Sequence, residues 1–287
     1  MTNITHTATF ALLGRTNVGK STLLNQLLDR QIAITSHKSH TTRNRILGVL
    51  TQDNYQMLFL DTPGLGQKTQ NPIQRLMMKT TQDCVMEADA FLFMIDSPQL
   101  NEMDKKLLQN LKSHHKPILL LVNKIDTLDA DGINQILESS VEDVQAIVPL
   151  SARKNMNLDV LIAQLRMCCK ESSAKYKEDF STDQSKEVMM AEIVREQILV
   201  FCHKEVPHEL KVDIEQYVVE EKVDHIHVLI TVKNNGQKKI LIGKQGSHLK
   251  KIGQNARLKI ESVFNKKIMM KIWIKVDPDW MDIGISE

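Results

Sequence analysis

Segments that would carry a chain into or across a membrane are missing from this sequence. Residues 1–6 contain no cationic stretch that leads into an apolar one. No run along the chain approaches the roughly 20 apolar residues that a membrane-spanning helix needs. We therefore expect a cytoplasmic protein that is neither exported nor membrane-spanning.

Cysteine is also scarce, and its placement argues against both disulfides and metal ligation. The four cysteines include no pair at the CxxC spacing of redox and zinc motifs. Cys168 and Cys169 are neighbours in a helical pattern, where adjacent side chains point in different directions. We expect free, mostly buried thiols at Cys84, Cys168, Cys169 and Cys202, as is usual for cysteine in the cytosol.

The composition is that of an ordinary globular protein, but the charge is unevenly distributed. With 287 residues, 42% of them hydrophobic, the chain has enough apolar material for a sizeable core and suggests about two domains. The net charge is only +2. The stretch from Lys233 to Lys275, however, holds 12 basic residues and a single acid, Glu261. Such a local excess of basic residues is expected in a protein that binds a polyanion.

The first 170 residues alternate apolar runs with helical patterns. Most of the apolar runs are continuous, which is typical of strands in a parallel sheet that helices bury on both faces. We predict an α/β domain over residues 1–170. Its expected strands are 7–13, 46–50, 56–60, 90–95, 117–122 and 146–150, and its expected helices are 21–28, 73–85, 105–111 and 158–167.

A polar stretch without a hydrophobic period follows, and we predict a linker over residues 171–187. The remaining residues, 188–287, are predicted to form a smaller α+β domain. Its expected elements are a helix over 188–203, strands over 211–219 and 225–232, a basic loop, a helix over 247–264 and a last strand over 268–276.

A glycine-rich motif stands between the first apolar run and the first helical pattern. It fits G-x-x-x-x-G-K-[ST], in which backbone N–H groups and a helix N-terminus surround phosphate oxygens. Lys20 is expected to reach the β and γ phosphates, and the Ser21 hydroxyl to ligate Mg²⁺. The predicted phosphate-binding residues are Gly14, Arg15, Thr16, Asn17, Val18, Gly19, Lys20 and Ser21. This motif alone does not distinguish ATP from GTP.

A second motif begins at Asp61, directly after the apolar run 56–60. A carboxylate at the carboxyl end of a core strand, beside the phosphate loop, is where a second Mg²⁺ contact is needed. A glycine three residues later can sense the γ-phosphate. We therefore add Asp61, Thr62, Pro63 and Gly64 to the predicted phosphate site.

A third motif closes the apolar run 117–122 and ends in Asp126. An aspartate carboxylate can accept hydrogen bonds from guanine N1–H and from the 2-amino group, whereas adenine has neither donor. Ser151 and Ala152 end the next run and are expected to give a backbone N–H to the guanine carbonyl. The predicted guanine-binding residues are Asn123, Lys124, Ile125, Asp126, Ser151 and Ala152. We therefore expect GTP or GDP as the ligand.

A switch segment is expected between the phosphate loop and Asp61. Residues 39–43 are polar and without period there. A threonine hydroxyl can bind Mg²⁺ when the γ-phosphate is present, which gives two conformations with different affinity for partners. Thr41 and Thr42 are both candidates.

The basic stretch near the C-terminus contains a GxxG loop from Gly243 to Gly246. Two glycines at this spacing let a phosphodiester backbone approach closely, as in KH domains, and the helix that follows accepts its charge. That helical pattern carries two adjacent lysines. The predicted RNA-binding residues are Ile242, Gly243, Lys244, Gln245, Gly246, Lys250 and Lys251.

Along its whole length the chain resembles the Era family of bacterial GTPases. The resemblance rests on residues 14–21, 61–64, 123–126, 150–152 and 236–246 and on the threonine segment before Arg43. It implies a P-loop GTPase domain, with a mainly parallel sheet and helices on both faces, followed by a type II KH domain. It also implies that Thr42 is the switch threonine and that Ser21, Thr42 and Asp61 are the Mg²⁺ ligands.

The same resemblance implies partners and a place in the cell. The RNA would be the 3′ end of small-subunit (16S) ribosomal RNA, and the role would be maturation of the 30S subunit. The protein would associate loosely with the inner membrane. We expect a monomer. Two positions depart from the family pattern: Thr16 stands where the family has proline, and Asn155 stands where it has glycine and could take the same left-handed backbone.

Hydrolysis of GTP has the least support in the sequence. Leu65, directly after Gly64, cannot orient water, so the usual glutamine is missing. The resemblance implies that Asn17 helps to hold K⁺ over the phosphates, where other GTPases use a positively charged finger. Alternatively, Asn17 only caps a turn. The sequence leaves both roles open.

Two other functions remain open at this point. A signalling or trafficking GTPase would use its second domain to bind protein, but the basic excess and the GxxG loop favour RNA. An ATP-dependent enzyme is opposed by Asp126. The first hypothesis is therefore an RNA-binding GTPase that cycles on and off the small ribosomal subunit.

Overall fold

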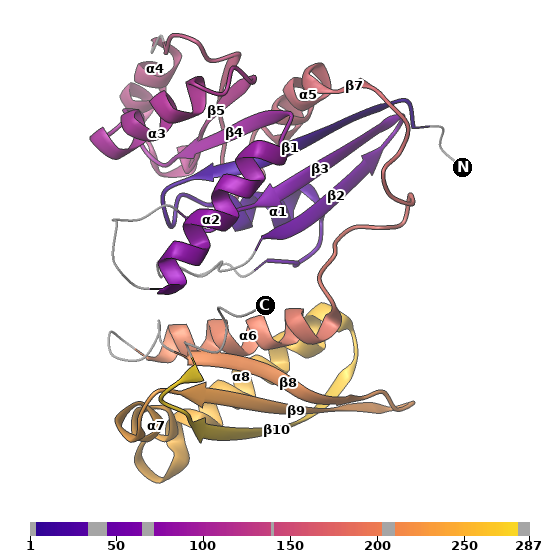
Figure 1. Cartoon of the computed structure of the whole chain (residues 1–287), viewed down its shortest axis with the longest axis vertical. Helices are drawn as coiled ribbons and strands as arrows, with labels where there is room; N and C mark the ends of the chain where they lie inside the picture. The colour runs from indigo at the N-terminus through magenta and orange to yellow at the C-terminus, as the bar shows by residue number, and fades with distance from the viewer. Residues whose placement is uncertain (1–3, 34–44, 65–71, 139–140, 203–209, 281–287) are drawn as a thin grey trace. The chain divides into compact units, whose positions relative to one another are not determined.

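The chain folds into two compact units. The computed structural model describes residues 4–33, 45–64, 72–138, 141–202 and 210–280. Contacts within it divide the chain into Met1–Asp183 and Gln184–Glu287 (Figure 1). Each unit has a hydrophobic core of its own, as expected for independent domains.

The first unit is built on one seven-stranded sheet. Its strands are β1 (His6–Gly14), β2 (Ile46–Gln52), β3 (Tyr55–Asp61), β4 (Ala90–Ile95), β5 (Ile118–Val122), β6 (Ala146–Pro149) and β7 (Lys170–Glu171). The order is β2-β3-β1-β4-β5-β6, with β7 paired to β1. Strand β2 is antiparallel to β3 and β7 to β1, whereas the other four pairs are parallel. The prediction of a mainly parallel sheet is confirmed.

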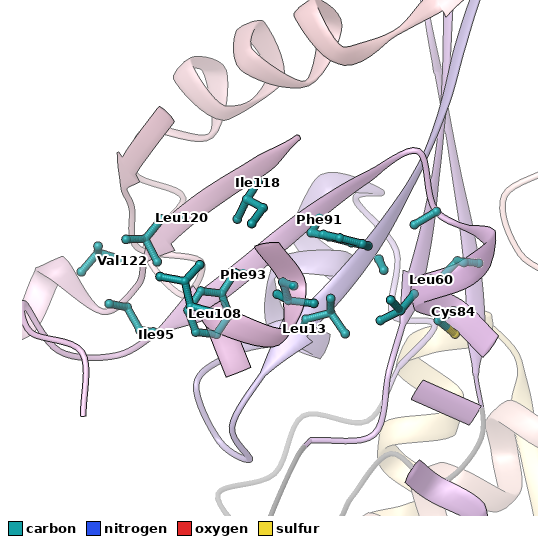
Figure 2. Packing of buried hydrophobic residues seen from close by; sticks show 14 of the residues in the cluster. Leu13, Leu60, Cys84, Phe91, Phe93, Ile95, Leu108, Ile118, Leu120 and Val122 are labelled. Atoms are coloured by element: carbon teal, nitrogen blue, oxygen red, sulfur yellow. The ribbon is translucent and has the colours of Figure 1, made fainter. Parts of the chain in front are cut away.

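Helices pack on both faces of this sheet. They are α1 (Lys20–Leu27), α2 (Pro72–Glu87), α3 (Glu102–Lys112), α4 (Ala130–Glu138) and α5 (Leu158–Cys168), with a 3-10 turn, η1 (Ile125–Thr127). Helices α2 and α3 contribute Cys84 and Leu108 to one buried cluster (Figure 2), and α4 contributes Ile136 to the same cluster. Leu47 and Val49 of β2 belong to this cluster, so Gly48 between them faces the other side of the sheet. A Cβ on Gly48 would stand only 2.7 Å from Leu24 Cδ1 of α1, so α1 lies on that opposite face.

The continuous apolar runs become strands that are buried on both sides. All six residues of β4 are buried, and so are all five of β5. Phe91, Phe93 and Ile95 of β4 lie in the cluster of Figure 2. Because successive side chains alternate, the residues between them face the other layer of helices.

Helix α4 has no counterpart among the predicted helices. It is nine residues long, too short for its period to stand out. Asp129 stabilises its first turn, because the Gly132 N–H donates to Asp129 Oδ1 at 2.9 Å.

Residues 170–183, which make up most of the predicted linker, pack against the first unit. Tyr176 and Phe180 stack with their ring centroids 4.6 Å apart and lie against the buried cluster. The Val49 N–H donates to the Ser181 carbonyl at 2.8 Å, which satisfies a group on the edge strand β2. The first unit therefore extends past residue 170, because contacts that are distant in sequence hold this polar segment.

The second unit is a three-stranded sheet with helices. Its elements are α6 (Lys186–Phe201), β8 (Leu210–Val218), β9 (Val223–Val232), α7 (Asn235–Ile242), a 3-10 turn η2 (Lys244–Gly246), α8 (Ser247–Phe264) and β10 (Lys267–Val276). Strand β9 is central, antiparallel to β8 and parallel to β10. Every second residue of β9, from Ile226 to Val232, is buried in a core that α6 and α8 complete with Val194 and Ile260.

Most of the predicted basic loop before residue 247 is a helix, α7, so this prediction is wrong. The Asn234 side chain caps its start by accepting the Gln237 N–H at 3.0 Å. The Gln237 side chain also accepts the Lys233 N–H at 2.8 Å. These two bonds stabilise the start of a helix of only eight residues.

None of the helices within the described ranges combines the length and the apolar character that crossing a bilayer requires. The four cysteines are free, as predicted: Cys84, Cys168 and Cys202 are buried, and Cys169 is partly buried.

Candidate nucleotide site and GxxG surface

The glycine-rich motif forms the loop between β1 and α1, and its backbone requires glycine. Gly14 has φ 145°, Asn17 φ 64° and Gly19 φ 110°. A Cβ on Gly14 would stand 2.3 Å from the Met94 carbonyl oxygen of the neighbouring strand β4. The loop therefore lies close against the carboxyl ends of the central strands, where open α/β sheets bind ligands.

Asn123, at the end of β5, ties this loop to the segment after β6. Its Nδ2 donates to the Val18 carbonyl at 2.7 Å, and its Oδ1 accepts the Ala152 N–H at 2.9 Å. A Cβ on Gly19 would stand 2.1 Å from the same Nδ2. One buried amide thus joins the predicted phosphate loop and guanine segment. Because the Ala152 N–H already donates to Asn123, a guanine carbonyl bound there would have to share this donor with Asn123.

Lys20, the first residue of α1, is folded onto the loop. Its Nζ donates to the carbonyls of Gly14 at 3.0 Å and Arg15 at 2.8 Å. Burial lowers the pKa of Lys20 to about 8, although the nearby Asp61 acts in the opposite direction. A phosphate anion beside this ammonium group would favour its charged form.

The second motif lies beside the first. Asp61 ends β3 and is fully buried, and Ser21 Oγ donates to its Oδ2 at 2.7 Å. The Thr62 hydroxyl donates to the Leu12 carbonyl at 2.5 Å. Pro63 is buried as well. A Cβ on Gly64 would stand 2.7 Å from Thr16 Cα, so the two predicted phosphate segments are in contact.

The third motif turns sharply after β5. Lys124 has a left-handed backbone with φ 66°, Ile125 is buried, and Asp126 is exposed. Ser151 Oγ donates to Asp126 Oδ1 at 2.6 Å, which orients the carboxylate that is predicted to bind guanine. Asn155 has φ 59°, so its predicted left-handed conformation is confirmed.

Two carboxylates that the sequence analysis missed belong to this site. Asp96, directly after β4, accepts hydrogen bonds from Arg15 Nη2 at 2.6 Å and from Lys124 Nζ at 2.7 Å. Asp104 of α3 accepts from Arg15 Nε at 2.9 Å. A signal for Asp96 existed, because it stands at the carboxyl end of its strand, as Asp61 and Asn123 do at theirs.

The predicted switch residues Thr41 and Thr42 lie outside the described residues, as does Leu65. Asn17 lies within the described residues and is exposed in the phosphate loop.

In the second unit, the GxxG loop forms η2 between α7 and α8. Gly243 has φ 71° and Gly246 φ 78°. A Cβ on Gly243 would stand 2.5 Å from His248 Cγ, whereas a Cβ on Gly246 would meet nothing within 4 Å. The first glycine is therefore required by packing, and the second leaves backbone open to a ligand.

The lysines around this loop face solvent. Ile242 ends α7 and is partly buried, whereas Lys244, Gln245, Lys250 and Lys251 are exposed. Gln245 has φ 52°, which adds to the sharpness of the turn. Exposed ammonium groups beside an accessible glycine backbone suit a phosphodiester chain.

These two units define a class of protein, a P-loop GTPase domain followed by a KH domain. A family model described as a 50S ribosome-binding GTPase matches residues 9–124, and one described as a KH domain matches residues 205–281. The chain is 37% identical to GTPase Era of Vibrio parahaemolyticus serotype O3:K6 over 284 residues, covering 96% of this chain and 88% of that protein. It is 38% identical to GTPase Era of Pseudomonas aeruginosa strain PAO1 over 275 residues, covering 95% and 90%. The chain belongs to the Era family of GTPases.

Two solved structures agree with this assignment. A crystal structure of Era in complex with MgGDPNP and nucleotides 1506–1542 of 16S ribosomal RNA matches with a TM-score of 0.89 and 35% identity, covering 96% of this chain and 95% of that one. A crystal structure of an Aquifex aeolicus Era variant bound to GDP·AlF4⁻ matches with a TM-score of 0.90 and 34% identity, with the same coverage. The family resemblance and the fold predicted from the sequence are confirmed, and the protein is a GTPase.

Proposed function

We propose that the protein binds GTP and GDP together with Mg²⁺ and binds the 3′ region of small-subunit ribosomal RNA through its KH domain. The observation that carries the nucleotide site is the interlock at Asn123, which bonds the Val18 carbonyl and the Ala152 N–H at once. Asn123 therefore joins the phosphate loop to the guanine segments, and the 2.7 Å hydrogen bond from Ser21 to Asp61 joins the second motif to the same loop. The three strand-end motifs act as one surface, with phosphate at the first two and guanine at the third.

The Mg²⁺ ligands proposed are Ser21, Asp61 and Thr42. A hydroxyl and a carboxylate are hard oxygen donors of the kind that Mg²⁺ prefers, and the Ser21 and Asp61 oxygens are 2.7 Å apart. The bound cation would neutralise negative charge on the phosphate oxygens. The chain itself holds the polyphosphate with loop N–H groups and Lys20. The MgGDPNP bound to the similar Era structure supports this part.

A K⁺ ion near Asn17 is the second cation proposed. Asn17 is exposed in the loop and has a left-handed backbone with φ 64°. This geometry suits a side chain that reaches over the phosphates, and it equally suits a turn residue. The cation would supply positive charge where other GTPases use an arginine finger.

The RNA site proposed is the GxxG loop with the start of α8. Gly246, whose added Cβ would meet nothing within 4 Å, allows the sugar-phosphate chain to approach the protein backbone. Lys244, Lys250 and Lys251 are exposed beside it. The Era structure with nucleotides 1506–1542 of 16S ribosomal RNA supports this choice of RNA.

The cellular role that follows is a GTP-dependent step in biogenesis of the 30S subunit. We place the protein in the cytoplasm as a monomer, with loose association at the inner membrane.

Filter binding with an RNA fragment from the 3′ end of 16S ribosomal RNA tests this proposal. The wild-type protein should retain this fragment more tightly than a shuffled RNA of equal length and composition. Equal retention of both RNAs would favour a GTPase whose second domain serves another partner.

A further inference from the structure

Two ion pairs that share Asp96 connect the phosphate loop with the guanine motif. Arg15 Nη2 lies 2.6 Å from Asp96 Oδ1, and Lys124 Nζ lies 2.7 Å from Asp96 Oδ2. Each oxygen of this carboxylate therefore serves a different segment. Since β4 lies between β1 and β5 in the sheet, Asp96 stands between the loop that follows β1 and the turn that follows β5.

The Arg15 end of this bridge is anchored in helix α3. Asp104 is fully buried, and its Oδ1 accepts Arg15 Nε at 2.9 Å. Its other oxygen accepts the Asn101 N–H at 3.2 Å, which is half of the capping box that begins α3. Asp104 cannot follow a moving loop without giving up this cap. The guanidinium is therefore held by two carboxylates, Asp96 at Nη2 and Asp104 at Nε.

The electrostatics keep the bridge charged. Burial raises the pKa of Asp96, but the hydrogen bonds and charges of Lys124 and Arg15 outweigh it, so the pKa of Asp96 lies below its ordinary value. The side chains of Arg15 and Asp96 are only about a quarter exposed, at 25% and 24%, so solvent screens this pair less than a surface pair.

The Arg15 backbone and Lys124 both belong to the proposed nucleotide site. The Arg15 carbonyl accepts Lys20 Nζ at 2.8 Å, so a shift of Arg15 also shifts the lysine that is proposed to hold the phosphates. Lys124 stands two residues before Asp126 and has a left-handed backbone, which a non-glycine residue keeps only when its surroundings hold it.

We propose that Asp96 is a positioning residue that holds the phosphate loop at a fixed separation from the guanine motif, by bridging Arg15 and Lys124. This inference rests on the proposed nucleotide site. One rigid ligand must fit both segments. If their separation is already fixed in the free protein, less conformational entropy is lost on binding. Both oxygens of the Asp96 carboxylate accept from protein side chains, Arg15 and Lys124, so we assign Asp96 no contact with phosphate or base. Its loss should therefore weaken retention of GDP and GTP alike and leave the preference for guanine unchanged.

Dissociation of a fluorescent GDP from Asp96→Asn, measured by stopped flow, tests this inference. We expect about tenfold faster dissociation than from the wild type, the change that loss of one charge-assisted hydrogen bond gives. The matched control is Asp53→Asn, which removes the 2.5 Å ion pair of Asp53 with Arg166 on α5. Equal dissociation from Asp96→Asn and Asp53→Asn would overturn the positioning role, whereas a wild type that does not bind GDP would overturn the nucleotide site itself.

A double-mutant cycle separates positioning from a general loss of stability. Arg15→Gln should also speed GDP dissociation. The Arg15→Gln, Asp96→Asn double variant should release GDP no faster than the faster of the two single variants, because each substitution removes the same bridge. Additive effects would contradict the bridge. Asp96→Glu retains a carboxylate and should recover slow dissociation. If Asp96→Asn does not fold, GDP dissociation from Arg15→Gln and Asp96→Glu still tests the bridge, since the first should be fast and the second slow.

Discussion

Gly19→Ala tests the interlock between the phosphate loop and the guanine side of the site. Gly19 has φ 110°, and its added Cβ would stand 2.1 Å from Asn123 Nδ2. Real Cβ contacts are never this short, so Asn123 or the loop must move. The hydrogen bond from Asn123 to the Val18 carbonyl, 2.7 Å long and buried, would then break or stretch.

The magnitude follows from two contributions. An alanine at this φ costs about 1–3 kcal/mol in backbone strain, and a buried amide left without its partner costs about 1–3 kcal/mol. The lower sum, about 2 kcal/mol, corresponds to roughly a 30-fold change in an equilibrium constant. In the nucleotide-free protein the loop can relieve the strain by moving. Binding has to restore the loop, so the cost should fall on affinity for GDP.

Isothermal titration with GDP should therefore show at least about a 30-fold higher Kd for Gly19→Ala than for the wild type. The matched control is Gly246→Ala, since Gly246 also has positive φ, at 78°, but its added Cβ would meet nothing within 4 Å. This control should leave the Kd for GDP unchanged. A Kd for Gly19→Ala within about threefold of the wild type would refute the argument that Gly19 and Asn123 are packed without spare room.

Further measurements address three single residues of the site. Asp126→Asn should lose affinity for GTP and gain affinity for xanthosine triphosphate, whose C2 carbonyl can accept a hydrogen bond from the new amide; a retained preference for GTP would show that Asp126 does not bind the base. Burial lowers the pKa of Lys20 to about 8, so between about pH 8 and 10.5 the unfolded chain holds a proton on this residue that the folded protein lacks. Without nucleotide, the contribution of Lys20 to stability should therefore become less unfavourable as the pH rises through this window. Because a phosphate anion favours the protonated Lys20, GDP binding at pH 9 should take up a proton, seen as a dependence of the binding enthalpy on buffer ionisation, and no uptake would contradict the contact. Hydrolysis of GTP should be faster in K⁺ than in Na⁺ at equal ionic strength, and Asn17→Ala should reduce the difference; equal rates in both salts would leave Asn17 with a structural role.

The elements that the sequence predicts best are those defined by local pattern. The continuous apolar runs of β4 and β5 became fully buried strands, because burial on both faces needs apolar residues at every position. The motif residues that follow β1, β3 and β5 came together because parallel strands bring their carboxyl ends to one edge of the sheet. Order along the chain therefore sufficed to assign the motifs of Gly19 and Asn123 to one site, and the structure shows that the two residues are in contact.

What the sequence did not reveal depends on contacts between distant residues. The segment 170–183 looks like a linker because it is polar, yet the Gln56 side chain donates to the Tyr176 carbonyl at 2.9 Å and holds it against the sheet. Helix α7 was missed because its stability comes from capping by Asn234 rather than from an amphipathic period. Asp96 was missed because it belongs to no motif of fixed spacing, so its place after β4 was not used until its partners Arg15 and Lys124 were seen.

RNA binding to a GxxG variant, measured as a function of salt, tests the central proposal most directly. Changing Lys244 and Gln245 together to Asp puts two carboxylates where phosphates must lie and leaves both glycines of the turn in place. Changing Lys250 and Lys251 to Gln removes only charge on α8. This second variant should lower affinity for all RNA sequences and make the salt dependence shallower by about 0.7 unit for each RNA phosphate that a lysine no longer neutralises.

The variant with Asp at positions 244 and 245 should bind the 16S 3′-end fragment much more weakly than the wild type. Its affinity for GTP, measured without RNA, should stay the same. Circular dichroism must show that the variant is folded. RNA binding by the folded variant that is as tight as that of the wild type would contradict the proposal that the GxxG loop holds the RNA backbone.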